Sequence, residues 1–316
     1  MCHACTPLAR LSTTGNPTGT PTGISRRALL ATGAGVPLLA AGAAGAVGAP
    51  RAARRLQVGG RRAKVLVFTR TNGYRHDSIP DAIDAITTLG QRHGFGVVAT
   101  EDPDRFTPRQ LEQYGALVFA NTVGNVLTRR SRVAIKQFVR SGGGWVGVHS
   151  AADTEYDWGF YSQLLSGGRF LAHPLQNQSG TLVRESERHL STRHLDERWQ
   201  IGQEEFYSFT NNVRGRARVL LSIDESSYSQ DPNTSMIPGG LGPQPPYITP
   251  ENLTVPTPVS GVMGDHPMSW TREIGRGLSW YTALGHEAAL YTDPTYRRHL
   301  VGGLVTAIRH GQRNLT

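Results

Sequence analysis

Four apolar runs, each separated from the next by a helix signal, dominate the first half of the chain after residue 62. They cover residues 64–69, 95–100, 115–121 and 145–148. Short continuous apolar runs are typical of parallel strands that are buried on both faces. Four strand–helix repeats within roughly ninety residues therefore predict an α/β fold with a doubly wound, mostly parallel sheet and helices on both of its faces.

The helix signals between these runs agree with that fold. Pro80 and Asp81 favour the start of a first helix, and Gly94 favours its end. Thr128 is a typical N-cap for a later helix, which we expect to stop at Gly142–Gly144. This glycine run precedes a strand and does not open a helix, so it does not indicate a phosphate-binding loop.

The second half of the chain has a less regular pattern. Its expected elements are three short strands over residues 180–184, 205–209 and 217–223, a β-hairpin over 268–273 and 277–282, and a closing helix over 294–310. Residues 226–260 are rich in proline, serine and glycine and show no clear period. We expect them to form a long loop insertion that shapes a site.

The first 49 residues have the features of a twin-arginine signal peptide. Arg26 and Arg27 precede an apolar run that contains glycines and Pro37 and ends in small residues. This composition favours cleavage over a retained membrane anchor. We therefore expect export, no stable membrane insertion after cleavage, a basic linker over residues 50–62 and one domain over residues 63–316.

Charge and cysteine content exclude several functions. Eight arginines and no acidic residue precede residue 63, so removing them from 33 basic residues leaves 25 against 24 acidic ones, a balance of +1. A nearly neutral domain does not suit a surface that follows nucleic acid phosphates. Both cysteines, Cys2 and Cys5, precede the domain. The domain therefore has no thiolate metal site, disulfide or cysteine nucleophile.

Several histidines follow predicted strands. His149 follows the fourth strand, His76 and Asp77 follow the first, and His286 follows the last. Because the carboxyl ends of parallel strands open into one crevice, we expect these side chains to share a site. A lone buried histidine more often hydrogen-bonds a backbone carbonyl. Several imidazoles beside carboxylates instead indicate proton transfer, or a divalent metal ion held by nitrogen and oxygen.

Six motifs follow one another in the predicted domain. They are Gly73–Asp77, Phe119–Thr122, Gly142–Ala151, Glu204–Tyr207, Asp265–Trp270 and Tyr281–His286. This order resembles the ThuA (trehalose-utilisation) family over residues 64–310. The resemblance implies a fold similar to that of class I glutamine amidotransferases, with His149 in the place of their nucleophilic cysteine. It implies carbohydrate metabolism on trehalose or a 3-keto derivative, and it argues against glutamine hydrolysis.

Candidate site residues fall into three groups. The predicted acid–base residues are His149, Glu205 and Asp77. The residues predicted to bind a carbohydrate substrate are His76, Asn121, Ser150, Tyr207, Trp270 and His286. A divalent metal ion is the cofactor that these residue types suit. The residues predicted to hold it are His149, His266 and His286.

Simpler structural roles compete with some of these assignments. Asp77 and Asn121 suit turns, and Trp270 suits a hydrophobic core. Strand alternation places Glu204 and Glu205 on opposite faces, so one of the two acids is expected to be solvated. The family resemblance selects Glu205 as the acid of the site. The sequence departs from the family motif at Glu204 and at the aromatic residue two positions later, which alters a candidate sugar-stacking face.

Two classes of function remain open. The first is an exported enzyme that acts on a carbohydrate by acid–base chemistry. The second is a non-catalytic module on the same fold that binds glycans or organises a surface complex. A serine-hydrolase mechanism is not favoured, because Ser150 lies outside any Gly-x-Ser-x-Gly turn.

Overall fold

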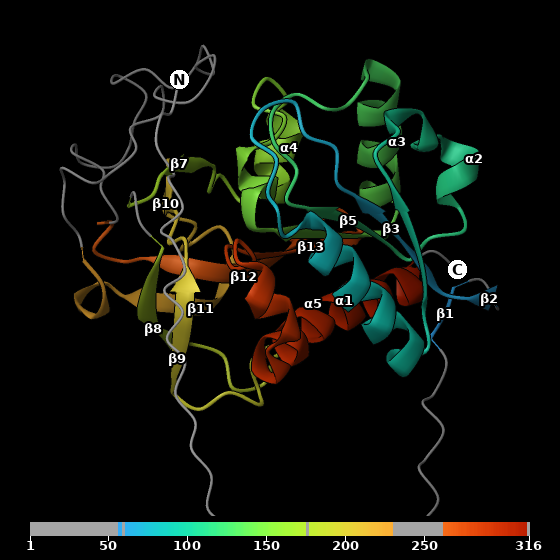
Figure 1. Ribbon diagram of the computed structural model, residues 1–316. Coiled ribbons are helices and arrows are strands. Elements are labelled where there is room, and N and C mark those ends of the chain that lie inside the picture. Colours follow the sequence, from blue (N-terminus) through green and yellow to red (C-terminus); the bar gives the residue numbers. More distant parts are fainter. Residues whose placement is uncertain (1–55, 59–60, 175–176, 230–261, 315–316) are drawn as a thin grey trace, which may run out of the picture. The chain divides into compact units, whose positions relative to one another are not determined.

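One nine-stranded sheet runs through the residues that the computed structural model describes, which are 56–58, 61–174, 177–229 and 262–314 (Figure 1). Its strands in chain order are β3 (Lys64–Phe68), β4 (Gly96–Thr100), β5 (Ala116–Ala120), β6 (Gly144–Val148), β8 (Gln178–Arg184), β9 (Arg198–Glu204), β11 (Arg218–Asp224), β12 (Pro267–Ile274) and β13 (Gly277–Thr282). Their order across the sheet is β4-β3-β5-β6-β13-β12-β11-β8-β9. The predicted α/β fold is therefore confirmed.

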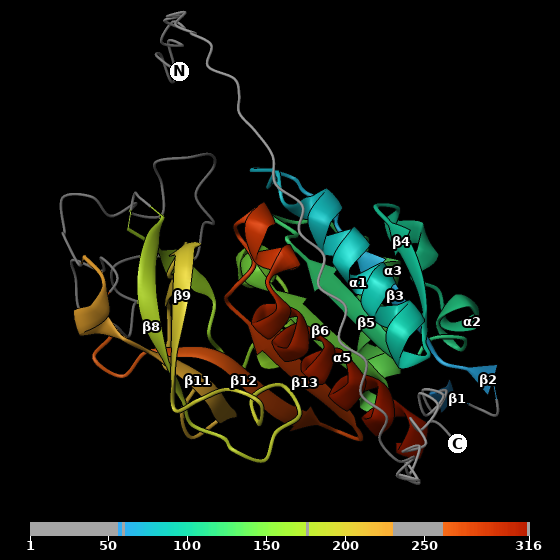
Figure 2. The ribbon, with the colours of Figure 1, turned by 60° about the horizontal axis from the view of Figure 1, so that its bottom comes forward.

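The strands from β4 to β13 form the parallel half of the sheet. The helices are α1 (Ile79–His93), α2 (Pro108–Leu111), α3 (Arg129–Arg140), α4 (Gly159–Leu164) and α5 (Pro294–Asn314). Helices α1 and α5 cover one face of the sheet, and α3 and α4 cover the other (Figure 1, Figure 2). Strands β5 and β6 are buried along their whole length, which explains their continuous apolar sequences.

The predicted helix ends are confirmed. Pro80 is at an early position of α1, and Gly94 ends this helix in the left-handed region, with φ +82°. The hydroxyl of Thr128 accepts a hydrogen bond from the backbone N–H of Ser131, so it caps α3 as expected. These ends fix where the chain leaves each helix and enters the next strand.

The strands from β13 to β9 form an antiparallel half. The predicted hairpin is confirmed as β12 and β13, and two of the predicted short strands are confirmed as β8 and β11. Strand β9 was not predicted from the sequence. The antiparallel half extends the sheet away from α1 and α5, and β8 and β9 end it (Figure 2).

The strand predicted over residues 205–209 is wrong. Strand β9 ends at Glu204, and only Ser208–Phe209 form a strand, β10, which pairs with β7 (Phe170–Ala172). Residues 205–207 connect β9 to β10. The buried Glu204 carboxylate anchors this turn, because it accepts hydrogen bonds from the backbone N–H groups of Glu205 and His286. The chain therefore turns from the far strand of the sheet back toward the ends of the parallel strands.

Three predictions fall wholly or largely outside the described residues. They concern the signal peptide (1–49), the loop insertion (226–260, described only to 229) and part of the linker (50–62). Within that linker, β1 (Gln57–Val58) pairs with β2 (Arg61–Arg62), and Leu56 is buried in the core. Among the described helices, none has both the length and the apolar character needed to cross a membrane.

Candidate active site

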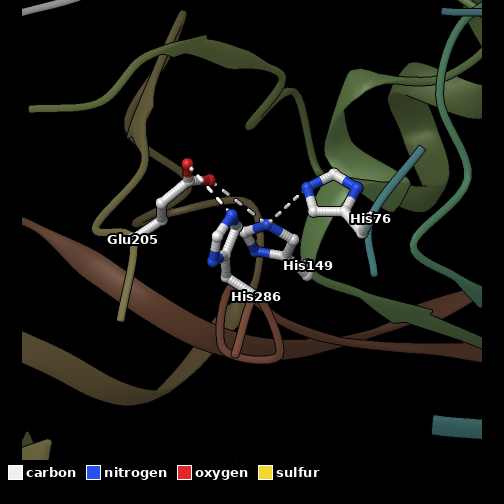
Figure 3. A group of neighbouring side chains, drawn as sticks. All are labelled: His76, His149, Glu205 and His286. Carbon is white, nitrogen blue, oxygen red and sulfur yellow. Dashed lines mark hydrogen bonds and ion pairs between the residues drawn. The ribbon is translucent and has the colours of Figure 1, made fainter. Parts of the chain in front are cut away.

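Four side chains from distant parts of the sequence meet at the carboxyl edge of the parallel strands. His76 follows β3, His149 follows β6, His286 follows β13 and Glu205 follows β9. Each offers one nitrogen or oxygen atom, and these four atoms lie within 4.8 Å of one another. Figure 3 shows the three rings and the carboxylate directed toward a common point. We call this group the histidine–glutamate centre.

His149 lies in the strained turn after β6. Its φ is +51°, which is uncommon for a residue other than glycine, and its side chain is fully buried. Nδ1 lies 2.8 Å from the carbonyl oxygen of Ala283, so this nitrogen donates a proton to that oxygen. Nε2 is thereby directed into the centre, 3.0 Å from the hydroxyl of Tyr207. Burial lowers the pKa of His149, which favours a neutral ring.

His76 faces His149 across the centre. The Nε2 atoms of the two rings are 3.1 Å apart, and Nδ1 of His76 lies 3.4 Å from the hydroxyl of Ser150. Burial, and then the neighbouring imidazole of His149, lower the pKa of His76 to about 2. The structure therefore brings His76 and Ser150 to the predicted site, where Ser150 contacts an imidazole.

Glu205 lies beside the rings and is the carboxylate of the centre. Its Oε2 is 3.4 Å from Nε2 of His149, and its Oε1 is 3.3 Å from Nε2 of His286. Burial acts to raise the pKa of Glu205, but contacts with His149 and the other imidazoles lower it to about 2. The side chain is 12% exposed, so the centre reaches solvent through it. The carboxylate of Glu205 is thus held in its ionised form beside the imidazoles.

Glu204 is completely buried and Glu205 is only 12% exposed, so the prediction that one acid of the pair is solvated is wrong. The Glu204 carboxylate accepts hydrogen bonds from the backbone N–H groups of Gly285, His286 and Glu205. Burial raises its pKa to about 8, although these three hydrogen bonds act in the opposite direction. Glu204 joins the turn after β9 to the turn after β13, and it therefore positions both Glu205 and His286.

His173 is a site residue that the sequence analysis missed. Its Nε2 lies 3.4 Å from Oε1 of Glu205, and its Nδ1 contacts the carbonyl oxygen of Pro174. It follows β7, whose pairing with β10 brings this histidine next to Glu205. No sequence pattern connects the two segments. The local sequence of His173 and Pro174 indicates only a strand end.

His266 does not belong to the centre, which corrects the predicted metal set of His149, His266 and His286. Its Nε2 donates to the carbonyl oxygen of Tyr207 at 2.8 Å, and its Nδ1 lies 2.9 Å from Oε1 of Glu225. Both ring nitrogens are occupied by these contacts. His266 therefore holds the backbone of Tyr207, whose hydroxyl contacts His149.

Asn121 has a structural role in place of the predicted substrate contact. Its side-chain amide donates to the hydroxyl of Ser78 at 2.9 Å and to the carbonyl oxygen of Gly285 at 3.0 Å. Its oxygen accepts a hydrogen bond from Tyr291. The residue is completely buried and has a φ of +53°. Asn121 therefore fixes the turn that carries His286.

Two more predicted residues lie outside the centre. Trp270 is completely buried and packs against Tyr281 and Phe209, with ring centroids 4.4 and 5.2 Å away, so it cannot serve as a platform for a sugar. Asp77 is exposed and does not belong to the group of converging ligand atoms. Burial of the tryptophan agrees with the simpler structural role considered for it.

Tyr74 is an exposed aromatic residue beside the centre. It is 59% exposed, and its ring meets the ring of His76 edge-on at a centroid distance of 4.8 Å. Partial burial, followed by the charges of Glu205, Asp77 and Glu287, raises its pKa. An exposed aromatic ring beside carboxylates has the character of a sugar-binding surface.

The fold and the centre define an α/β protein with a buried imidazole–carboxylate site. The sequence profile of the ThuA family, described as trehalose utilisation, matches residues 64–307. The chain belongs to the ThuA family, as its motifs indicated, and this membership supports a carbohydrate-related role in general. No curated protein matches the chain.

Two solved structures share this fold. A ThuA-like protein from Bacteroides uniformis has 23% identity and a TM-score of 0.59, over 77% of this chain and 89% of that one. A ThuA-like protein from Parabacteroides merdae has 16% identity and a TM-score of 0.54, over 78% of this chain and 90% of that one. The arrangement of strands and helices described above is therefore shared with other ThuA-like proteins.

Proposed function

We propose that this protein is an enzyme that moves a proton next to the carbonyl group of a keto-sugar, such as a keto-disaccharide derived from trehalose. The observation that carries this proposal is the meeting of three imidazole nitrogens and one ionised carboxylate within 4.8 Å. The expected family chemistry on carbohydrates supports the choice of substrate class. The absence of cysteine from residues 63–316 is consistent with chemistry that uses no thiol.

His149 and Glu205 share the acid–base work in this proposal. The carboxylate of Glu205 accepts the proton from the carbon next to the carbonyl group, and the adjacent Nε2 of His149 relays protons to and from oxygen. The 3.4 Å separation of these two groups allows them to act on one substrate. The exposed ring of Tyr74, which contacts His76, gives the sugar ring a surface to lie on.

Turnover of sugars by the purified protein tests this proposal. We expect conversion of 3-keto-trehalose or a related keto-glycoside, and the His149→Ala variant should be slower by about 100-fold or more. Product formation is followed by proton NMR, and trehalose serves as the non-oxidised comparison. Full turnover by His149→Ala would contradict the assignment. Sugar binding without any conversion would instead favour the non-catalytic glycan-binding module.

We also propose that the protein is exported in its folded state by the twin-arginine route. Arg26 and Arg27 ahead of an apolar run of small residues support this localisation. Cell fractionation of the source organism should find the protein outside the cytoplasm. The double variant Arg26→Lys and Arg27→Lys should stay inside. Cytoplasmic location of the unaltered protein would contradict export.

A further inference from the structure

The proposed reaction needs a positive charge at the histidine–glutamate centre. Removal of a proton next to a carbonyl group places negative charge on the carbonyl oxygen, and enzymes stabilise such charge with a donor or a metal ion. The groups that contact Glu205 are the imidazoles of His149, His173 and His286. A cation bound among them would supply the missing charge.

The spacing of the four side chains matches the coordination shell of a small divalent ion. Nε2 of His149 lies 3.1 Å from Nε2 of His76 and 3.4 Å from Oε2 of Glu205, and Nε2 of His286 lies 3.3 Å from Oε1 of Glu205. A tetrahedral zinc ion with bonds of about 2.0–2.1 Å holds its ligand atoms about 3.3–3.4 Å apart. Three of the six pairs of side chains therefore lie at ligand-to-ligand distances, although His149 and His286 contact different oxygens of Glu205, and all four ligand atoms lie within 4.8 Å of one another.

The hydrogen bonds around the centre direct lone pairs toward its middle. Nδ1 of His149 donates to the carbonyl oxygen of Ala283, so Nε2 of a neutral His149 ring presents a lone pair. This lone pair faces the carboxylate of Glu205 and Nε2 of His76. Acceptor atoms at such distances repel one another unless a proton or a metal ion lies between them, and without an ion the hydroxyl of Tyr207, 3.0 Å from Nε2 of His149, supplies such a proton.

A second layer of contacts orients the remaining rings. Nδ1 of His286 lies 3.4 Å from Oε1 of Glu287, and the side-chain amide of Asn177 contacts both groups. Nδ1 of His76 lies beside the hydroxyl of Ser150. Oxygen atoms behind the outer nitrogens of metal-bound histidines fix the ring orientation and increase ligand basicity. For His149 this oxygen is the backbone carbonyl oxygen of Ala283, so all three histidines have an oxygen atom beside the outer nitrogen.

We propose that His76, His149, His286 and Glu205 bind one divalent transition-metal ion of the zinc class. Three imidazoles and one carboxylate suit such ions, and thiolate ligands are not required. This inference rests on the proposed function for its role in catalysis, but the metal site itself stands on geometry alone. His149 then holds the ion in place of relaying protons. The carboxylate oxygen of Glu205 that is not bound keeps the role of base.

Proton transfer is balanced in this arrangement. The free oxygen of Glu205 takes the proton from the carbon, and the electron pair of the broken C–H bond passes into the enolate. A divalent ion held by these residues would stabilise the negative charge of the enolate oxygen, which would bind it as a fifth ligand. No oxidant or reductant is consumed. Return of the proton to carbon restores both the carbonyl group and the carboxylate of Glu205.

Equilibrium dialysis of the purified full-length protein against zinc chloride, followed by elemental analysis, tests the site. We expect one zinc ion per chain, and His286→Ala should weaken its binding by about 100-fold or more, since one of four ligands is lost. The control variant His310→Ala alters a histidine at the end of α5 that contacts Arg276 and should bind zinc normally. Far-ultraviolet circular dichroism checks that each variant is folded.

Glu205→Gln keeps the shape of the side chain and provides a second variant if His286→Ala does not fold. Equal zinc binding by wild type, His286→Ala and Glu205→Gln would overturn the metal site, as would less than one ion in the wild type. Turnover of a keto-sugar by metal-free protein would overturn the metal inference and leave the proposed function intact. Zinc bound by these four residues without turnover of any sugar would support the metal site and contradict the proposed function.

Discussion

Glu205→Gln should reduce kcat on a keto-sugar by about 100- to 10,000-fold, because the amide cannot accept a proton. The substitution preserves the size of the side chain and the backbone turn after β9. The loss should therefore appear in steady-state kinetics while the melting temperature changes little. This carboxylate contacts His149 and His286 directly, so we expect one of the two largest effects in the protein here.

Two matched carboxylate variants serve as controls for that experiment. Glu187→Gln alters an acid whose side chain is 81% exposed and contacts only Arg184 among the ion pairs of the described residues. Asp77→Asn alters the exposed acid that the sequence placed in the site and the structure does not. Both should retain activity within about twofold, as expected for surface positions. A loss in Asp77→Asn as large as that in Glu205→Gln would contradict the corrected site.

Trp270→Ala should lower the free energy of unfolding by about 3–5 kcal/mol, the second large effect. Its indole, on β12, is completely buried and packs edge-on against Phe209 and at a tilt against Tyr281. Removal leaves a cavity that this packed layer cannot easily close. Urea unfolding followed by tryptophan fluorescence and circular dichroism measures the change.

Val133→Ala provides the comparison for that stability measurement. Val133 lies on α3 and is 60% exposed, so its substitution should change stability by no more than about 0.5 kcal/mol. A Trp270→Ala variant as stable as Val133→Ala, with weakened sugar binding, would instead restore the tryptophan as a sugar platform. The structure predicts the reverse result.

The parallel half of the fold could be predicted from the sequence because two independent signals agree there. Continuous apolar runs identify strands that helices cover on both faces, and residues such as Gly94 and Thr128 mark the helix ends between them. The antiparallel half offers weaker signals, because its strands are partly exposed. Residues 205–207 resemble a continuing strand, but the contacts of Glu204 with a distant turn remove them from the sheet.

The part of the candidate site that lies directly after the parallel strands could be predicted from the sequence. The rule that carboxyl ends of parallel strands share one edge located His76, His149 and His286 correctly. His266 precedes β12, which is antiparallel to β13, so His266 lies near the same edge of the sheet. Its ring contacts the backbone of Tyr207 and does not reach the centre itself. The pairing of β7 with β10 places His173 next to Glu205. Strands as short as these have no sequence pattern from which their pairing could be predicted.

The most direct test of the histidine–glutamate centre is deuterium exchange on a keto-sugar in D2O, followed by proton NMR at the carbon next to the carbonyl group. The wild-type protein should replace this proton by deuterium, and His149→Ala and Glu205→Gln should exchange it no faster than the sugar does alone. Equal exchange by all three proteins, or product formation without exchange in the wild type, would contradict proton transfer at this centre.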